Sequence, residues 1–288
     1  MNKLKKTLVL FLAFVLCLGL CCGCGETEEN EAGSTSVETM PVEEVPDYVI
    51  GLMEEVDSVR IRENMEMSFN INGNSMAMAG DAVCEVSESQ GIAHVSSNVT
   101  NMGLSMNAEM YVEKKGNEAD MYMSIGNGGN WSKMTVPVST LENQNGYHED
   151  MMEFSIYLSA LTNVERTTVT HNGKAAYLIK GQVDYNKIVD FVMEAGFANA
   201  VAQGSAEMEN KIKEIYKDLD PVEVSVYLDA ATGLPMQIEA DPTAMFNSFY
   251  ANATEGNMTM SLDKAHIMIT FEDYNNVTVE IPAEAKGN

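Results

Sequence analysis

The stretch Met102–Asn117, MGLSMNAEMYVEKKGN, decides the fold. In its first part, polar Ser105, Asn107 and Glu109 alternate with apolar side chains. The apolar set is Met102, Leu104, Met106, Ala108, Met110 and Val112. A period of two places this set on one face of a β-strand, and Gly116-Asn117 marks the turn that ends it. The stretch therefore predicts a strand with one apolar and one polar face, as in an antiparallel sheet.

The same alternation extends in both directions along the chain. Upstream, Met65–Ile71 alternates and is followed by the turn pair Asn72-Gly73. Downstream, Met121–Ile125 is followed by a turn rich in Gly and Asn and then by Trp131–Val136. Further strands are predicted at residues 82–86, 166–169, 174–183, 222–229, 235–240, 258–272 and 277–281. We therefore expect a meander of antiparallel strands.

Helical patterns lie before and between these strands. Their apolar positions recur three and four residues apart, and the last of them ends at a proline. The predicted helices cover residues 46–59, 148–161, 185–195 and 206–219. Helices separated from runs of strands in this way are typical of an α+β fold, in which helices pack on one side of a sheet.

Three short motifs resemble the LolA/LppX-type lipoprotein carriers and their uncharacterised Gram-positive lipoprotein relatives. Tyr227–Pro235 is similar to a strand–turn–strand late in those proteins, Asn130–Lys133 to a hairpin strand bearing a Trp, and Val279–Pro282 to their closing strand. The resemblance covers about residues 46–285. It implies a curved antiparallel sheet that forms an incomplete β-barrel, with helices packed on its concave side and an apolar cavity between sheet and helices. None of the motifs is a ligand motif, so the resemblance assigns no binding residue.

The N-terminus has the layout of an export signal. Three lysines precede an apolar run at residues 7–20, which is short for a membrane span of about 20 residues. Four of the five cysteines lie within residues 17–24, at the end of this run and just after it, and only Cys24 stands between two glycines. Leu20–Cys24 resembles a bacterial lipobox, which implies removal of residues 1–23 and a diacylglycerol on Cys24. The protein would then be anchored to the cell membrane and face away from the cytoplasm. An ordinary secretory signal is the alternative.

The next segment, residues 24–45, is acidic. From Gly25 to Val45 there are seven glutamates, no Lys or Arg and no aromatic residue. Such a composition predicts a flexible tether, with an acidic binding tail as the alternative. Residues 46–288 would then form a single LolA/LppX-like domain.

Charge limits the classes of partner. The formal net charge is −26, and nucleic-acid phosphates require Lys and Arg, so we expect no nucleic-acid partner. Anionic lipid head groups should also repel the chain, which leaves the lipid anchor as its link to the membrane. No protein partner can be named.

Methionine is unusually frequent, with 22 residues, and Met-x-Met recurs at strand spacing. Three interpretations are open: flexible core filler, soft thioether ligands for a copper ion, or a deformable lining for an apolar ligand. The candidate lining residues are Met65, Met67, Met102, Leu104, Met106, Met110, Met121 and Met123.

No pattern predicts catalysis. The histidines are scattered, and we find no His-Glu-x-x-His pair or Gly-x-Ser-x-Gly elbow. We therefore expect no enzyme, no catalytic residue, no metal site and no cofactor. The predicted function is the binding or carriage of a lipid or another apolar ligand. The alternative is a surface interaction or sensor protein with a filled core and no small-molecule ligand.

Overall fold

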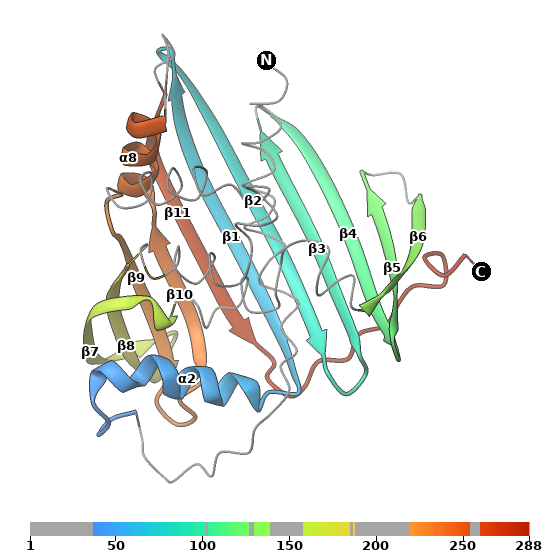
Figure 1. Cartoon of the computed structure of the whole chain (residues 1–288), viewed down its shortest axis with the longest axis horizontal. Coiled ribbons are helices and arrows are strands. Elements are labelled where there is room, and N and C mark those ends of the chain that lie inside the picture. Colours follow the sequence, from blue (N-terminus) through green and yellow to red (C-terminus); the bar gives the residue numbers. More distant parts are fainter. Residues whose placement is uncertain are drawn as a thin grey trace, which may run out of the picture.

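The computed structural model describes residues 37–101, 103–126, 130–138, 158–184, 187, 219–253 and 260–287. Its described strands form one antiparallel sheet of eleven strands (Figure 1). They are β1 (Ser58–Ile71), β2 (Asn74–Ser87), β3 (Ile92–Asn101), β4 (Leu104–Lys115), β5 (Glu118–Ile125), β6 (Trp131–Pro137), β7 (Leu161–His171), β8 (Lys174–Val183), β9 (Val222–Asp229), β10 (Pro235–Asp241) and β11 (Met260–Glu272).

The sheet consists of two meanders joined through their first and last strands. Its order is β6-β5-β4-β3-β2-β1-β11-β10-β9-β8-β7, so β1 pairs with β11 and the two meanders extend away from that pair. Within the described residues β6 and β7 form opposite edges, and the curved sheet stays unclosed. The predicted curved antiparallel sheet in the form of an incomplete barrel is confirmed.

One face of this sheet is apolar across nearly its whole width. Residues paired directly across antiparallel strands project their side chains to the same side. One such row reads Met123, Met110, Val95, Cys84, Ile61 and Phe271 from β5 to β11. We call this side the inner face and the opposite side the outer face.

Helix α2 (Val45–Glu54), preceded by the 3₁₀ helix η2 (Val42–Glu44), covers the inner face over β8 to β10 (Figure 1). Val45 and Val49 are buried there against sheet residues that include Val226 and Ile238. Burial of each such side chain contributes about 1.5–3 kcal/mol. The helix was predicted to reach residue 59, but it ends at Glu54 and β1 begins at Ser58. The reason is the period-two alternation of apolar and charged residues from Val59 onward.

A second helix, α8 (Thr243–Ala253), covers another part of the inner face and was not predicted. Its Phe246 packs against Met65, Met67 and Leu262. The Asn247 side chain donates to the Leu262 carbonyl at 2.9 Å and accepts from the Leu262 amide at 2.7 Å. This amide pair docks α8 on β11. Of the predicted helix at 148–161 the structure describes only residues 158–161, of the one at 185–195 only Lys187, and of the one at 206–219 only Leu219; the rest lie outside the described residues.

The packed region begins earlier than residue 46. The N-terminal segment, Val37–Glu44, was predicted to be part of the flexible tether, but Val37 and Met40 are buried in the same core cluster as Val45 and Val49 of α2. Arg166 on β7 donates to the carbonyls of both residues. The folded domain therefore includes Val37. Burial of Val37 and Met40 and the two hydrogen bonds from Arg166 hold this segment in place despite the acidic residues around it.

The C-terminal segment lies on the outer face, where Val277, Val279 and Ile281 are buried against Tyr111 and Tyr122. Residues 277–281 were predicted to be a strand and are not one. Apolar residues do alternate in this segment, but its backbone amides bond to side chains instead of to a neighbouring strand. The Val277 amide donates to Ser58 Oγ at 3.1 Å and the Val279 amide to Gln90 Oε1 at 2.9 Å.

Candidate ligand-binding surface

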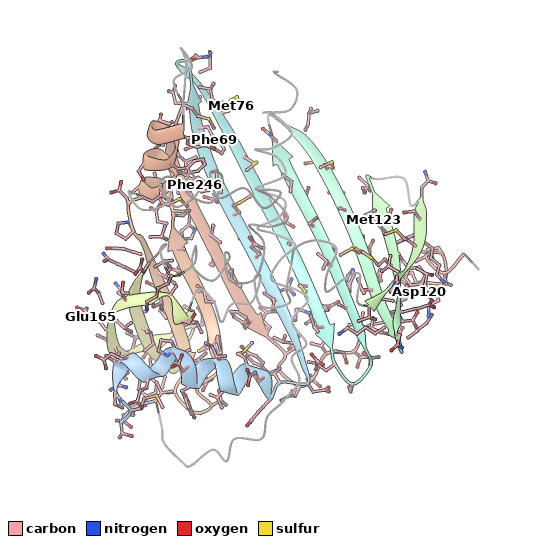
Figure 2. All side chains as sticks on the ribbon, viewed as in Figure 1. Phe69, Met76, Asp120, Met123, Glu165 and Phe246 are labelled. Carbon is pink, nitrogen blue, oxygen red and sulfur yellow. The ribbon has the colours of Figure 1, made fainter. Side chains whose placement is uncertain are left out.

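The predicted lining residues divide into two groups. Met65 and Met67 are 2% and 5% exposed and lie in a packed cluster with Phe69, Met78 and α8. Figure 2 shows Phe69 and Phe246 together at one end of β1, away from Met123 on β5. The first two methionines therefore act as core residues.

The second group lies on β4 and β5 and is much less covered. Large apolar side chains on β4, β5 and β6 are exposed; they are Leu104 (77%), Met106 (42%), Met123 (42%), Ile125 (59%) and Met134 (55%). We call this set the apolar wing. Met110 and Met121 are half-buried beside it. Met102 lies outside the described residues.

Strand register places the wing on the inner face. Met123 pairs with Met110, Ile125 with Ala108, and Met134 with Met121. The wing is continuous with the packed methionines, because one row of paired residues reads Met106, Val99, Gly80 and Met65. A Cβ placed on Gly80 would lie 3.5 Å from Met65 Cε and 3.8 Å from Val99 Cγ2. The structure thus brings the predicted lining residues that it describes onto one face, and covers only some of them.

Ionisable side chains are scarce on this face. At the paired inner-face positions of the described strands we find Glu63, Lys114 and Arg166. Glu63 is 6% exposed and pairs with Ala82 and Ile269. Arg166 is hydrogen-bonded to the N-terminal segment, and Lys114 is next to last in β4. The face is therefore suited to an apolar partner.

A cluster of charged residues on the outer face ties the strands of the wing together. Asp120 on β5 accepts from Lys115 Nζ on β4 at 2.7 Å, and from Thr135 Oγ1 at 2.5 Å and Lys133 Nζ at 2.9 Å on β6. Hydrogen bonds from Lys115, Thr135 and Lys133 hold the pKa of Asp120 well below its usual range. Because the Asp120 carboxylate links β5 to both of its neighbours, β4 and β6, it holds the three strands of the wing together from the outer face.

A second outer-face group surrounds His94 on β3. Its ring stacks on Tyr111 at 4.2 Å, and its Nδ1 lies 3.0 Å from Glu85 Oε2. Burial would raise the pKa of Glu85, but hydrogen bonds from His94 and Arg60 outweigh this effect and lower it. The Tyr111 hydroxyl in turn donates to Glu109 Oε1 at 3.0 Å, and we interpret this hydrogen-bonded group as structural. Among the described residues, no three His, Cys, Asp or Glu side chains are grouped to hold a metal ion.

The sequence alone did not separate covered from exposed methionines. Met65 and Met106 share the same alternating pattern and the same row of paired residues, yet Met65 is buried and Met106 is 42% exposed. The difference comes from α8, whose position on β11 no strand pattern contains.

Comparison with known proteins gives a family and a distant likeness in fold. Residues 41–288 match the model of a family described as "Family of unknown function (DUF6612)". No curated protein matches the chain. The described helices include none that is long and apolar enough to cross a membrane.

Two solved structures are similar over most of the chain. One is a DUF1329 family protein from Desulfovibrio piger, at 8% identity and a TM-score of 0.27, covering 85% of this chain and 96% of that one. The other is a β-barrel-like protein with the domain of unknown function DUF1849 from Brucella abortus, at 9% identity and a TM-score of 0.22, covering 75% and 96%. At these scores neither structure supports an argument about the function of this chain.

Proposed function

The chain belongs to DUF6612, a family of unknown function, and we propose that it is a lipid-anchored protein on the outer side of the cell membrane that binds a lipid or another apolar molecule. The ligand would lie on the apolar wing. The proposal includes no reaction and no cofactor.

The supporting observation is the exposure of the wing itself. Five large apolar side chains on three adjacent strands remain 42–77% exposed, although residues of the same face are buried under α2 and α8. Contiguous exposed apolar surface on a soluble domain commonly marks a ligand or interaction site. Full burial of one such side chain contributes about 1.5–3 kcal/mol, so a ligand that covers several of them gains substantial free energy.

The residue types of the wing suit a ligand of irregular shape. Met106, Met123 and Met134 carry unbranched, polarizable side chains that adapt to different partners. The outer-face bonds of Asp120 hold the three strands beneath them in register. Methionine-rich surfaces of this kind can adapt to apolar molecules of different shapes.

The anchor rests on the lipobox resemblance at Leu20–Cys24, with Cys24 as the lipidated residue. Two acyl chains are enough for stable membrane attachment. The ligand-binding domain would then lie next to the membrane from which a lipid could be taken.

A second candidate function is a surface interaction or sensor protein without a small-molecule ligand. It is favoured by the two packed clusters, because side chains fill the inner face under α2 and α8. The wing would in that case contact another protein.

Lipid co-purification distinguishes the two. We would extract the full chain from membranes in a non-ionic detergent and quantify bound lipid by mass spectrometry. Met106→Glu places a charge in the wing and should abolish retention of the lipid. The matched control is Asn107→Glu, one residue along β4 and exposed on the outer face, which should retain the lipid as the unmodified chain does. Absence of a stoichiometric lipid from the unmodified chain, or equal retention by both variants, would contradict the proposal.

A further inference from the structure

We infer that Met106, Met123 and Met134 are a modification site, at which hydrogen peroxide outside the cytoplasm oxidises the thioethers to sulfoxides and so releases the apolar ligand of the wing. We call these three residues the wing methionines. The inference rests on the proposed function and adds to it a chemical means of regulation.

The first argument is the selective exposure of these sulfur atoms. The wing methionines are 42–55% exposed. The buried methionines of the packed cluster beside α8, in contrast, are Met65 (2%), Met67 (5%) and Met78 (9%). Cys84 is only 2% exposed as well. Because an oxidant must reach the sulfur atom from water, the reaction is directed to the wing.

The reaction is a two-electron transfer of oxygen. The thioether sulfur attacks one oxygen of hydrogen peroxide, so that a sulfur–oxygen bond forms and the peroxide O–O bond breaks. Sulfur is oxidised by two electrons, and the departing hydroxide takes up the proton of the transferred oxygen and leaves as water. Methionine sulfoxide reductases can restore the thioether.

The second argument is the place of the modification within the proposed site. Met106, Met123 and Met134 lie on the adjacent strands β4, β5 and β6, so oxidation changes the wing across its whole width. A sulfoxide is polar, and its oxygen accepts hydrogen bonds from water. An alkyl chain that covers this oxygen offers no donor, so binding would leave a buried acceptor without a partner.

The third argument is that the sheet beneath the wing contains no oxidisable group in its outer-face support. Asp120 links β5 to β4 and β6 through Lys115, Thr135 and Lys133, and none of these side chains contains sulfur. The three strands therefore stay in register while the inner face becomes polar. A ligand that already covers the wing shields the sulfur atoms, so unoccupied protein is oxidised first.

The test treats the full chain, purified in a non-ionic detergent, with hydrogen peroxide and follows sulfoxide formation at each methionine by peptide mass spectrometry. The wing methionines should be oxidised about tenfold faster than Met65, Met67 and Met78. Equal rates in the two groups overturn the inference.

Binding is measured on samples withdrawn during the same reaction. Each is irradiated with a photoreactive long-chain alcohol, and labelling of the peptides that carry β4, β5 and β6 is quantified. Labelling should fall at least about tenfold as the three sulfoxides accumulate and should return after treatment with methionine sulfoxide reductases. Undiminished labelling of the oxidised wing overturns the inference and leaves the proposed function standing. If the untreated chain is not labelled, the proposed function fails, and the inference fails with it.

A variant that combines Met106→Leu, Met123→Leu and Met134→Leu locates the effect. Leucine is apolar and similar in volume and has no sulfur to oxidise. Peroxide should leave the labelling of this variant at its own starting level, whatever that level is. The matched control is Met268→Leu on the outer face of β11, where Met268 pairs with Asn64; its labelling should fall as that of the unmodified chain does. An equal proportional loss in the triple variant overturns the assignment to the wing. The reductase experiment on the unmodified chain decides whether oxidation controls binding even if the triple variant does not fold.

Discussion

Replacement of Gly233 by Ala tests how the N-terminal segment and α2 dock on the sheet. Gly233 lies in the turn between β9 and β10, with φ +79° and its amide donating to the Asp229 carbonyl at 2.8 Å. An added Cβ would lie 2.9 Å from Leu52 Cδ1, 3.3 Å from Tyr48 Cε1 and 3.5 Å from Val37 Cγ2. The turn therefore touches both α2 and the N-terminal segment.

Two effects contribute to the expected loss of stability. A left-handed backbone costs an L-residue about 1–2 kcal/mol, and overpacking against Leu52 and Tyr48 costs about 1–3 kcal/mol more. We expect the free energy of unfolding to fall by about 2–5 kcal/mol, which for a domain of this size lowers Tm by about 4–20 °C. Chemical denaturation followed by circular dichroism measures the change in free energy.

The matched control is Gly173→Ala in the turn between β7 and β8. Gly173 has the same φ of +79°, but nothing lies within 4 Å of its added Cβ. The control should lose about 1–2 kcal/mol from backbone strain alone, and the change in unfolded-chain entropy is common to both variants. The difference between them isolates the contact with α2. Equal losses would refute the packing of α2 and Val37 against the β9–β10 turn.

Three further predictions concern the anchor, the outer face and the N-terminal segment. Cys24→Ala should leave unlipidated precursor or released protein in membrane fractionation, whereas Cys22→Ala should be processed normally; the opposite pattern would reassign the lipidated cysteine. Because hydrogen bonds depress the pKa of Asp120 in the folded state, its stabilising contribution is present above the usual aspartate range near pH 4 and is lost as pH falls below it. Asp120→Asn should therefore be less stable at pH 7 and lose less on acidification to pH 3 than the unmodified chain; parallel denaturation curves across this range would contradict the assignment. Arg166→Met removes both hydrogen bonds to the N-terminal segment and should cost about 2 kcal/mol while increasing amide exchange there, whereas Arg62→Met, at an exposed outer-face ion pair, should be nearly neutral.

Local pattern predicted the strands best where turn residues bounded them. The boundaries predicted for β8 and β9 agree with the structure, because Asn172-Gly173 opens β8 with both residues at positive φ and Asp229 starts the next turn. β3 was missed, since its inner-face residues include the small or polar Ala93 and Ser97 and the alternation is weak. Its pairing with β2 and β4 holds it in the sheet.

In two segments the sequence pattern predicted the wrong local structure. The alternation of Val277, Val279 and Ile281 is that of a strand, but these residues pack on the outer face while side chains bond the backbone. The acidic composition of residues 24–45 predicted a tether through Val45, whereas two buried apolar side chains extend the packed domain back to Val37. In both cases a residue far away in the sequence determines the structure of the segment: Ser58 bonds Val277, and Arg166 bonds Met40.

The sequence by itself determined which side chains share a face, because the period of two is a property of the extended backbone and needs no information from elsewhere in the chain. Only the tertiary structure decided how much of that face is covered. Met65 and Met106 lie in one row of paired residues, but α8 docks beside Met65 through Asn247 and Leu262, and Met106 stays 42% exposed. Coverage depends on where a segment nearly 180 residues away in the chain comes to lie, and such long-range contacts leave no periodic signal in the strand that they cover.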